Sequence, residues 1–163
     1  MTTEFAETSL LRIGYEVAGP QNGFPVIVTH GWPDDVRTWD PVLPALHAAG
    51  IRTYAPWLRG YGPTRFLRDE TFRSGQLVAL GQDLMEFAHA LHLGRHALVG
   101  HDWGARAAYV ASTLDEPRVA ACVALSVGYG TNVPGQTLSY PQTQNYWYHW
   151  LMATPRGERL EWS

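Results

Sequence analysis

The chain has 163 residues, of which 45% are hydrophobic, and 12 basic against 15 acidic side chains give it a formal net charge of −3. This length supports one domain with a sizeable core, and the composition excludes a disordered chain. Every basic residue is an arginine, no cationic footprint for nucleic acid is present, and no apolar run reaches the length of a membrane span.

Cysteine usage and the N-terminal residues suggest a compartment. The single cysteine, Cys122, cannot form an internal disulfide and suits a reducing environment. Residues 1–5 lack the basic and apolar regions of a secretory leader. We therefore expect a cytoplasmic protein.

Strands and helices alternate along the first half of the chain. Alternating apolar side chains predict a strand at residues 11–17 with one buried face, and a β-branched run predicts a strand buried on both faces at 25–29. A helix is expected to begin at the cap Asp40 and to stop at Gly50. A strand is expected at residues 51–55.

The next elements continue this alternation. Ser74 is the predicted cap of a helix that ends by Gly94 and has apolar side chains at helical spacing on one face. A buried strand is predicted at residues 118–126. The order predicts an α/β fold with a mostly parallel sheet and helices on both faces, in which ligands bind beyond the carboxyl ends of the strands.

Residues 99–105, Val-Gly-His-Asp-Trp-Gly-Ala, join a predicted strand to a predicted helix. Gly100 and Gly104 stand two positions to either side of Asp102, which is the pattern of a nucleophile elbow with Asp in place of Ser. The strained turn leaves no room for neighbouring side chains, and a helix N-terminus favours a carboxylate anion. Taken alone, the pattern also fits an Asp that caps a helix in a glycine-rich turn.

A second motif, His30-Gly31-Trp32-Pro33, follows the predicted strand at residues 25–29. It lies at the same end of the sheet as Asp102, so the backbone N–H of Trp32 and that of Trp103 can point at one place. Two converging N–H donors form an oxyanion hole. By itself this motif would be an ordinary strand-to-loop turn, and the two motifs in this order are more specific than either one.

The character of the sequence changes near residue 128. Residues 131–143 are polar and rich in turn formers, and residues 146–150 are Tyr-Trp-Tyr-His-Trp. We expect residues 1–127 to form a sheet-containing core and residues 128–163 to form the start of a helical lid. The aromatic run could also be a partner-binding patch, but a lid that packs on a core explains it more simply.

The motifs resemble the α/β-hydrolase fold family, and within it the branch with an Asp nucleophile, which contains epoxide hydrolases and haloalkane dehalogenases. Three segments fall in the order of that family: residues 30–33, residues 58–64 (Leu-Arg-Gly-Tyr-Gly-Pro-Thr) and residues 100–105. The resemblance covers almost the whole chain. It implies that Asp102 is the nucleophile and that Trp32 and Trp103 supply the oxyanion N–H groups. Trp57 departs from the acidic residue that many members have there.

An Asp nucleophile indicates the kind of bond that is attacked. Attack on an ester carbonyl would give a high-energy anhydride, whereas attack on a saturated carbon gives a stable ester. The expected target is a small molecule with an electrophilic sp³ carbon that bears a leaving oxygen or halogen. Water then attacks the carbonyl of the Asp102 ester, and the oxyanion hole serves that second step.

The choice between epoxide and halide rests on fewer residues. Tyr148 resembles the first of two lid tyrosines that donate to the ring oxygen in epoxide hydrolases, although it could be a packing residue. Trp103 could donate to a halide, but haloalkane dehalogenases usually pair it with Asn where this chain has Trp32. Arg106 matches one of two arginines of fluoroacetate dehalogenases, and the other is absent. The balance favours an epoxide, with haloalkane or haloacid dehalogenation as the alternative.

No cofactor or metal is expected. The sequence has no phosphate-binding loop, and His89, His92 and His96 are interpreted as surface histidines, because a glycine separates the last from the helix of the first two. His30 and His101 are expected to brace their loops.

The resemblance also implies residues that this sequence does not show. In the family, the histidine that acts as general base and the carboxylate that holds it come after the lid, and a second lid tyrosine is also present. No His of residues 1–163 matches that general base, and the second tyrosine is absent. We therefore interpret the sequence as an N-terminal portion that turns over poorly by itself. An open apolar edge at residues 119–125 predicts self-association. A non-catalytic hydrolase-like module is the alternative.

Overall fold

The computed structural model describes residues 2–127, 137, 139–152 and 154–158. Its contacts divide the chain into two compact units, Met1–Tyr129 and Gly130–Ser163, and each unit is described by itself. Within the described residues, no helix combines the length and the apolar character needed to cross a bilayer.

Strands of the first unit form one sheet in the order β1-β2-β4-β3-β6-β7, and β5 is a further partner of β2. Strands β4, β3, β6 and β7 are parallel, whereas β2 pairs antiparallel with β1, β4 and β5. The expectation of a mostly parallel α/β sheet is therefore confirmed. The strands are β1 Glu4–Glu7, β2 Leu11–Ala18, β3 Phe24–Thr29, β4 Ile51–Pro56, β5 Arg65–Phe66, β6 His96–His101 and β7 Val119–Leu125.

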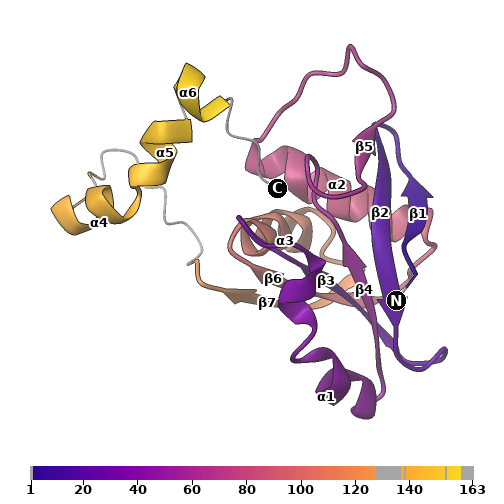
Figure 1. Ribbon diagram of the computed structural model, residues 1–163. Helices are drawn as coiled ribbons and strands as arrows, with labels where there is room; N and C mark the ends of the chain where they lie inside the picture. Colours follow the sequence, from indigo (N-terminus) through magenta and orange to yellow (C-terminus); the bar gives the residue numbers. More distant parts are fainter. Residues whose placement is uncertain (1, 128–136, 138, 153, 159–163) are drawn as a thin grey trace. The chain divides into compact units, whose positions relative to one another are not determined.

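Helices cover both faces of this sheet (Figure 1). Side chains alternate between the faces along a strand, so Ile27 packs on one face and Val26 and Val28 pack on the other. Ile27 belongs to the cluster that contains α2 and α3, and its neighbours belong to the cluster that contains η1 and α1. The helices are η1 Val36–Trp39 (a 3-10 turn), α1 Leu43–Ala48, α2 Leu77–Ala90 and α3 Trp103–Leu114.

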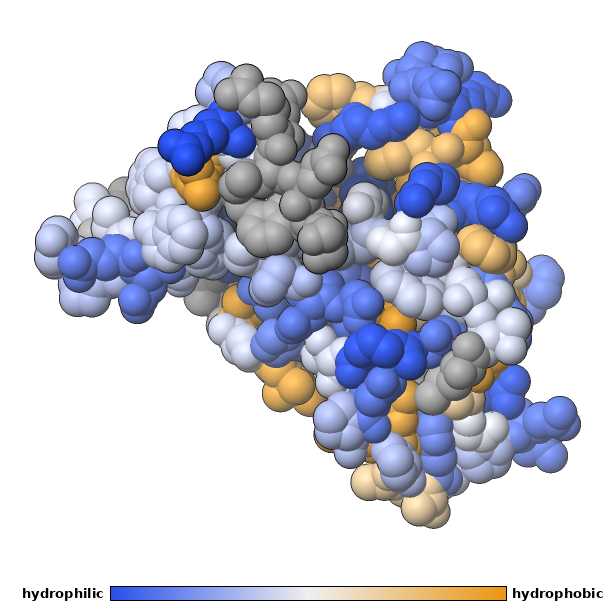
Figure 2. Space-filling view, in the orientation of Figure 1, coloured by the Kyte–Doolittle hydropathy of each residue, from blue (hydrophilic) through white to orange (hydrophobic). Residues whose placement is uncertain are grey.

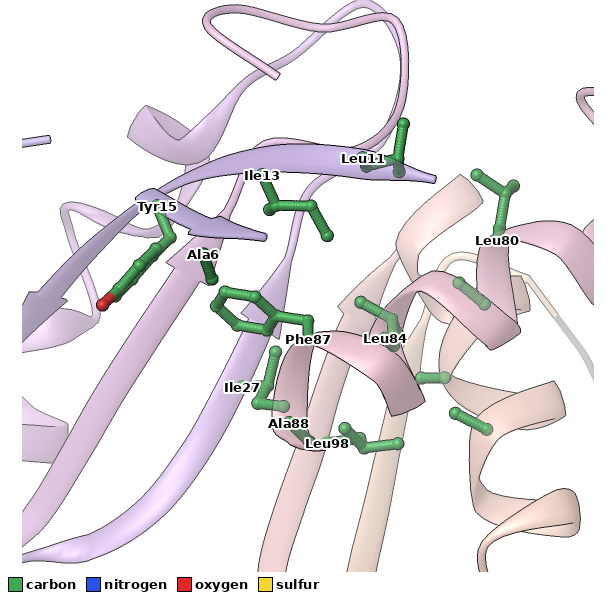
Figure 3. Packing of buried hydrophobic residues seen from close by; sticks show 13 residues of the cluster. Ala6, Leu11, Ile13, Tyr15, Ile27, Leu80, Leu84, Phe87, Ala88 and Leu98 are labelled. Carbon is green, nitrogen blue, oxygen red and sulfur yellow. The ribbon is translucent and has the colours of Figure 1, made fainter. Parts of the chain in front are cut away.

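The larger core cluster lies between β2, β3, α2 and α3 (Figure 3). Phe87 of α2 is fully buried, and its ring meets that of Tyr15 edge-on at 5.2 Å. Helices α2 and α3 approach closely because Gly81 of α2 leaves room for Val110 of α3: a Cβ on Gly81 would collide with the Val110 side chain. This packing fixes α3, whose first residue follows Asp102.

Four local expectations differ from the structure. Asp40 does not cap α1, which begins at Leu43 after the 3-10 turn, because the Asp40 N–H closes that turn on the carbonyl of Arg37. Ser74 does not cap α2, whose N-cap is Gln76; the Ser74 hydroxyl accepts from the N–H of Gln76 itself, and the Ser74 carbonyl accepts from Arg59. Glu16, expected on the open face of its strand, is 7% exposed and pairs with Arg37.

The fourth difference concerns β7. The strand forms where it was expected, but it is not buried: Val123 is 50% exposed and Leu125 is 44% exposed. Strand β7 is the last in the sheet order, so within the described residues only β6 pairs with it. Figure 2 shows one face of the molecule, on which hydrophilic residues and smaller groups of hydrophobic residues are interspersed.

The second unit contains short helices in its described part. They are α4 Tyr140–Asn145, α5 Trp147–Met152 and α6 Pro155–Glu158. Ser139 and Gln142 form a capping box at the start of α4. In α5, Trp147 is 61% exposed and Trp150 is 59% exposed. That this unit begins a lid stays a prediction.

Candidate active site

Asp102 occupies a strained turn between β6 and α3. Its φ is +52° and its ψ is −114°, a backbone conformation that residues with a side chain rarely adopt. A Cβ on Gly100 would collide with the backbone of Gly104, and a Cβ on Gly104 would collide with the backbone of Thr29 and His30. The elbow geometry expected from residues 99–105 is thus present. Gly100 and Gly104 are both required because no side chain fits at either position.

The Asp102 carboxylate points to the neighbouring loop. Its Oδ1 accepts a hydrogen bond of 3.0 Å from the backbone N–H of Trp32, and it makes no capping bond to α3. A Cβ on Gly31 would collide with the Asp102 side chain. Asp102 is therefore not a simple helix cap, and only glycine fits at position 31.

The second expected donor is the N–H of Trp103. Helix α3 begins at this residue, and the first N–H groups of a helix have no acceptor within it. The structure thus brings the carboxylate of Asp102, the N–H of Trp32 and the start of α3 together at the carboxyl ends of β3 and β6.

His30 fastens the loop that carries Trp32. It is fully buried; its Nδ1 lies 2.9 Å from the carbonyl oxygen of Gly31, and its Nε2 accepts from the Leu58 N–H at 3.1 Å. Because the Gly31 carbonyl can only accept, Nδ1 carries the proton. Burial lowers the pKa of His30. A neutral imidazole with both nitrogens engaged braces the loop, as expected from the sequence.

The Trp32–Pro33 peptide bond of this loop is cis. A further contact links the same loop to the elbow: Nδ1 of His101 lies 3.9 Å from Oδ2 of Asp34. This distance is too long for a hydrogen bond, and within the described part of the chain His101 Nδ1 has no hydrogen-bond partner.

The loop after β4 was not recognised as part of the site from sequence reasoning. Arg59 donates to both carboxylate oxygens of Asp83 on α2, each at 2.6 Å, and both side chains are buried. Arg59 also donates to the carbonyls of Ser74 and Ala79. Burial raises the pKa of Asp83, and the Arg59 hydrogen bonds counteract that rise. The loop is therefore clamped to α2.

The same loop has two further structural features. Trp57, for which the sequence indicated no role, packs its indole against Gly62. A Cβ on Gly62 would collide with that indole. Tyr61 lies edge-on to His30, with ring centroids 4.8 Å apart. The sequence singled out residues 58–64 as a family-like segment that contains Tyr61. The segment alone does not show which of its side chains faces the elbow.

A cavity of about 600 Å³ opens beside the elbow in the first unit. Trp103, the residue after Asp102, lines it together with Leu58, Tyr61, Phe66 and Leu80. Its size is that of a small-molecule site.

The remaining candidate residues are Tyr148 and the three histidines near the end of α2. Tyr148 lies on α5 in the second unit, and its role as a donor stays a prediction. His89 and His92 are exposed, but His96 is 2% exposed and its Nδ1 meets the Gly94 carbonyl at 2.9 Å, so the interpretation of His96 as a surface residue is wrong. Within the described residues, no group of three or more His, Cys, Asp or Glu side chains could hold a metal ion.

These features define a protein of the α/β-hydrolase class, and comparison with known proteins agrees. The chain belongs to the α/β-hydrolase fold family, whose model matches residues 25–162.

Within that family, its relatives include epoxide hydrolases. It is 36% identical over 126 residues to epoxide hydrolase A of Mycobacterium tuberculosis, an alignment that covers 77% of this chain and 38% of that protein. A crystal structure of an inferred epoxide hydrolase from Klebsiella pneumoniae is 40% identical, with a TM-score of 0.87, and the match covers 96% of this chain and 52% of that one. The epoxide hydrolase of Vigna radiata has a TM-score of 0.79 at 25% identity, covering 96% and 51%. The chain thus spans about half the length of these solved structures.

Proposed function

We propose that this chain carries the nucleophile and oxyanion hole of a hydrolase of the epoxide-hydrolase type, with Asp102 as the nucleophile. The observation that supports this most strongly is the 3.0 Å hydrogen bond from the Trp32 N–H to Oδ1 of Asp102 at a positive-φ elbow. A backbone donor on one carboxylate oxygen orients the other oxygen for attack. The names of the similar proteins support an epoxide as the substrate.

The proposed reaction has two steps. In the first, a carboxylate oxygen of Asp102 forms a bond to a ring carbon of the epoxide, the carbon–oxygen bond of the ring breaks, and the alkoxide takes a proton from the Tyr148 hydroxyl. In the second, water adds to the carbonyl carbon of the Asp102 ester. The N–H groups of Trp32 and Trp103 stabilise the resulting oxyanion. Its collapse breaks the ester bond; one proton of the water goes to the departing diol oxygen, the other restores the Tyr148 hydroxyl, and Asp102 returns to the carboxylate.

No histidine of the 163 residues matches the base that activates this water in the family, and His30 has both ring nitrogens engaged. We therefore expect this chain by itself to form the ester faster than it hydrolyses it. The proposed partner is a small-molecule substrate, and the proposal involves no cofactor.

Intact-protein mass spectrometry tests the proposal. The chain is incubated with a terminal epoxide, a haloalkane of the same carbon skeleton and an ester, and we expect a mass increase of one epoxide molecule. Asp102→Asn should abolish this adduct, whereas Glu116→Gln, a change in an exposed carboxyl that does not line the cavity, should keep it. An adduct with the haloalkane but not the epoxide would favour dehalogenation, and no adduct with any probe would refute the nucleophile.

A further inference from the structure

The inner wall of the cavity beside the elbow is mostly apolar, whereas the charged side chains of Arg65, Asp69 and Arg73 line the cavity from exposed positions. Leu58, Phe66, Leu80 and Trp103 supply hydrocarbon and aromatic surface, and Tyr61 is the phenol among them. The hydroxyl of Thr64, which also lines the cavity, is committed to the Trp57 carbonyl at 2.8 Å. Within the described part of the chain, the Tyr61 hydroxyl has no hydrogen-bond partner.

The position of Tyr61 is fixed from several directions. Its backbone N–H donates to the Leu58 carbonyl at 3.0 Å, and its carbonyl accepts from the Thr64 N–H at 3.1 Å. Its ring packs edge-on against the buried ring of His30. The Arg59–Asp83 pair holds the same loop to α2. A side chain held in this way is organised before a ligand arrives, which lowers the entropy lost on binding.

Tyr61 is also electrostatically coupled to the nucleophile. Burial, and after it the negative charge of Asp102, raises the pKa of Tyr61 to about 12. The phenol therefore keeps its proton at neutral pH and can act as a donor.

The stereochemistry of the proposed reaction indicates what Tyr61 can reach. A nucleophile displaces a leaving group from the opposite side of a saturated carbon, so the epoxide oxygen departs away from Asp102. Tyr61 packs on the ring of His30, which precedes Gly31, where an added Cβ would collide with the Asp102 side chain. It thus flanks the nucleophile, and the part of the substrate that it meets is the substituent on the ring.

Resting on the function proposed above, we propose that Tyr61 is a specificity-determining residue that donates a hydrogen bond to an ether or carbonyl oxygen in the substituent of the epoxide. The substrate class that fits this wall is an epoxide with an aryl or alkyl group attached through such an oxygen. Arg59 also lines the cavity, but its donors are committed to Asp83 and to two carbonyls. A fixed phenol amid apolar surface favours an acceptor oxygen within an otherwise apolar ligand.

A matched ligand pair tests this inference without requiring chemistry. The diol of phenyl glycidyl ether is compared with the diol of its all-carbon analogue, in which a methylene group replaces the ether oxygen. Isothermal titration calorimetry on the 163-residue chain should show the ether diol binding about two- to tenfold more tightly, the effect of one neutral hydrogen bond. In Tyr61→Phe, which keeps the ring on His30, this preference should disappear while binding of the all-carbon diol is unchanged.

Tyr54→Phe is the control, because the Tyr54 hydroxyl interacts with Arg52 and this residue is not part of the cavity wall. An unchanged preference in Tyr61→Phe, an equal loss for both diols, or no measurable binding of either would overturn the inference. Because diol binding does not depend on ester formation, this result is separate from the Asp102 adduct test. Where the adduct forms, its rate with the two parent epoxides should show the same dependence on the Tyr61 hydroxyl.

Discussion

Removing Arg59 should reveal how strongly the loop that carries Tyr61 is anchored. In Arg59→Met the aliphatic stem remains, but the Asp83 carboxyl, which is 6% exposed, loses the partner of both its oxygens. Breaking one side of a buried pair costs about 3–5 kcal/mol. Protonation sets an independent upper bound on this cost, because the unpaired Asp83 carboxylate can take up a proton instead of staying charged. Protonating a carboxyl with an ordinary pKa of about 3.9 at neutral pH costs about 4 kcal/mol.

The pH dependence of this loss follows from the sign of the pKa shift. Burial raises the pKa of Asp83, and without Arg59 nothing opposes that rise. The folded variant then binds more protons than its unfolded state, so its stability increases as pH falls from neutral toward about 4. The deficit relative to the unmodified chain should shrink by up to about 1.4 kcal/mol per pH unit.

Urea denaturation followed by tryptophan fluorescence at about pH 7 and about pH 5 measures the loss of unfolding free energy and its dependence on pH. Arg65→Met, a change in an exposed arginine, is the control, and Arg59→Met combined with Asp83→Asn should recover part of the stability at neutral pH. At neutral pH the single variant should melt about 8–16 °C lower. A deficit that is the same at both pH values, or no recovery in the double variant, would contradict the account of a buried, unpaired carboxylate.

Three further predictions concern the site and the sheet edge. Gly31→Ala should lower the rate of Asp102 ester formation about 10- to 100-fold, because a Cβ there displaces the Asp102 side chain from the Trp32 N–H. Mass spectrometry measures this rate, and an unchanged rate would show that the contact is dispensable. His30 is buried with a lowered pKa, so unfolding free energy should fall as pH drops below about 6.5, where the unfolded state binds the extra proton; His30→Gln should lack this slope in urea titrations. Val123→Glu on the exposed strand β7 should reduce self-association in sedimentation velocity, and a chain that is monomeric without the change would refute that expectation.

The features that the sequence predicted are those with local causes. A glycine two residues to either side of Asp102 signals a turn with no space for a Cβ, and both collisions are found. The β-branched run at residues 25–29 became a strand whose last four residues are buried. The alternation of strands and helices predicted a parallel sheet, which places the carboxyl ends of β3 and β6 at the same edge, and the structure pairs these two strands directly.

The features that it missed depend on partners far away in the chain. Arg59 and Asp83 are 24 residues apart, and neither the loop nor the helix pattern indicates that they meet. Glu16 and His96 carry polar side chains, so alternation and helix-breaking rules placed them at the surface, whereas Arg37 and the Gly94 carbonyl satisfy them in the interior. Helix starts were also misplaced: the Asp40 N–H closes the 3-10 turn, and the Ser74 hydroxyl accepts from the N–H of the N-cap Gln76 rather than from one inside α2.

The central claim is that Asp102 is a nucleophile oriented by the backbone of the neighbouring loop. Peptide mapping by tandem mass spectrometry after exposure to an epoxide tests it most directly, because it locates the new ester on a single side chain. The account predicts the modification on Asp102, and its absence from Asp34 and Asp35 in the adjacent loop. An ester found on another carboxylate, with Asp102 unmodified, would contradict it.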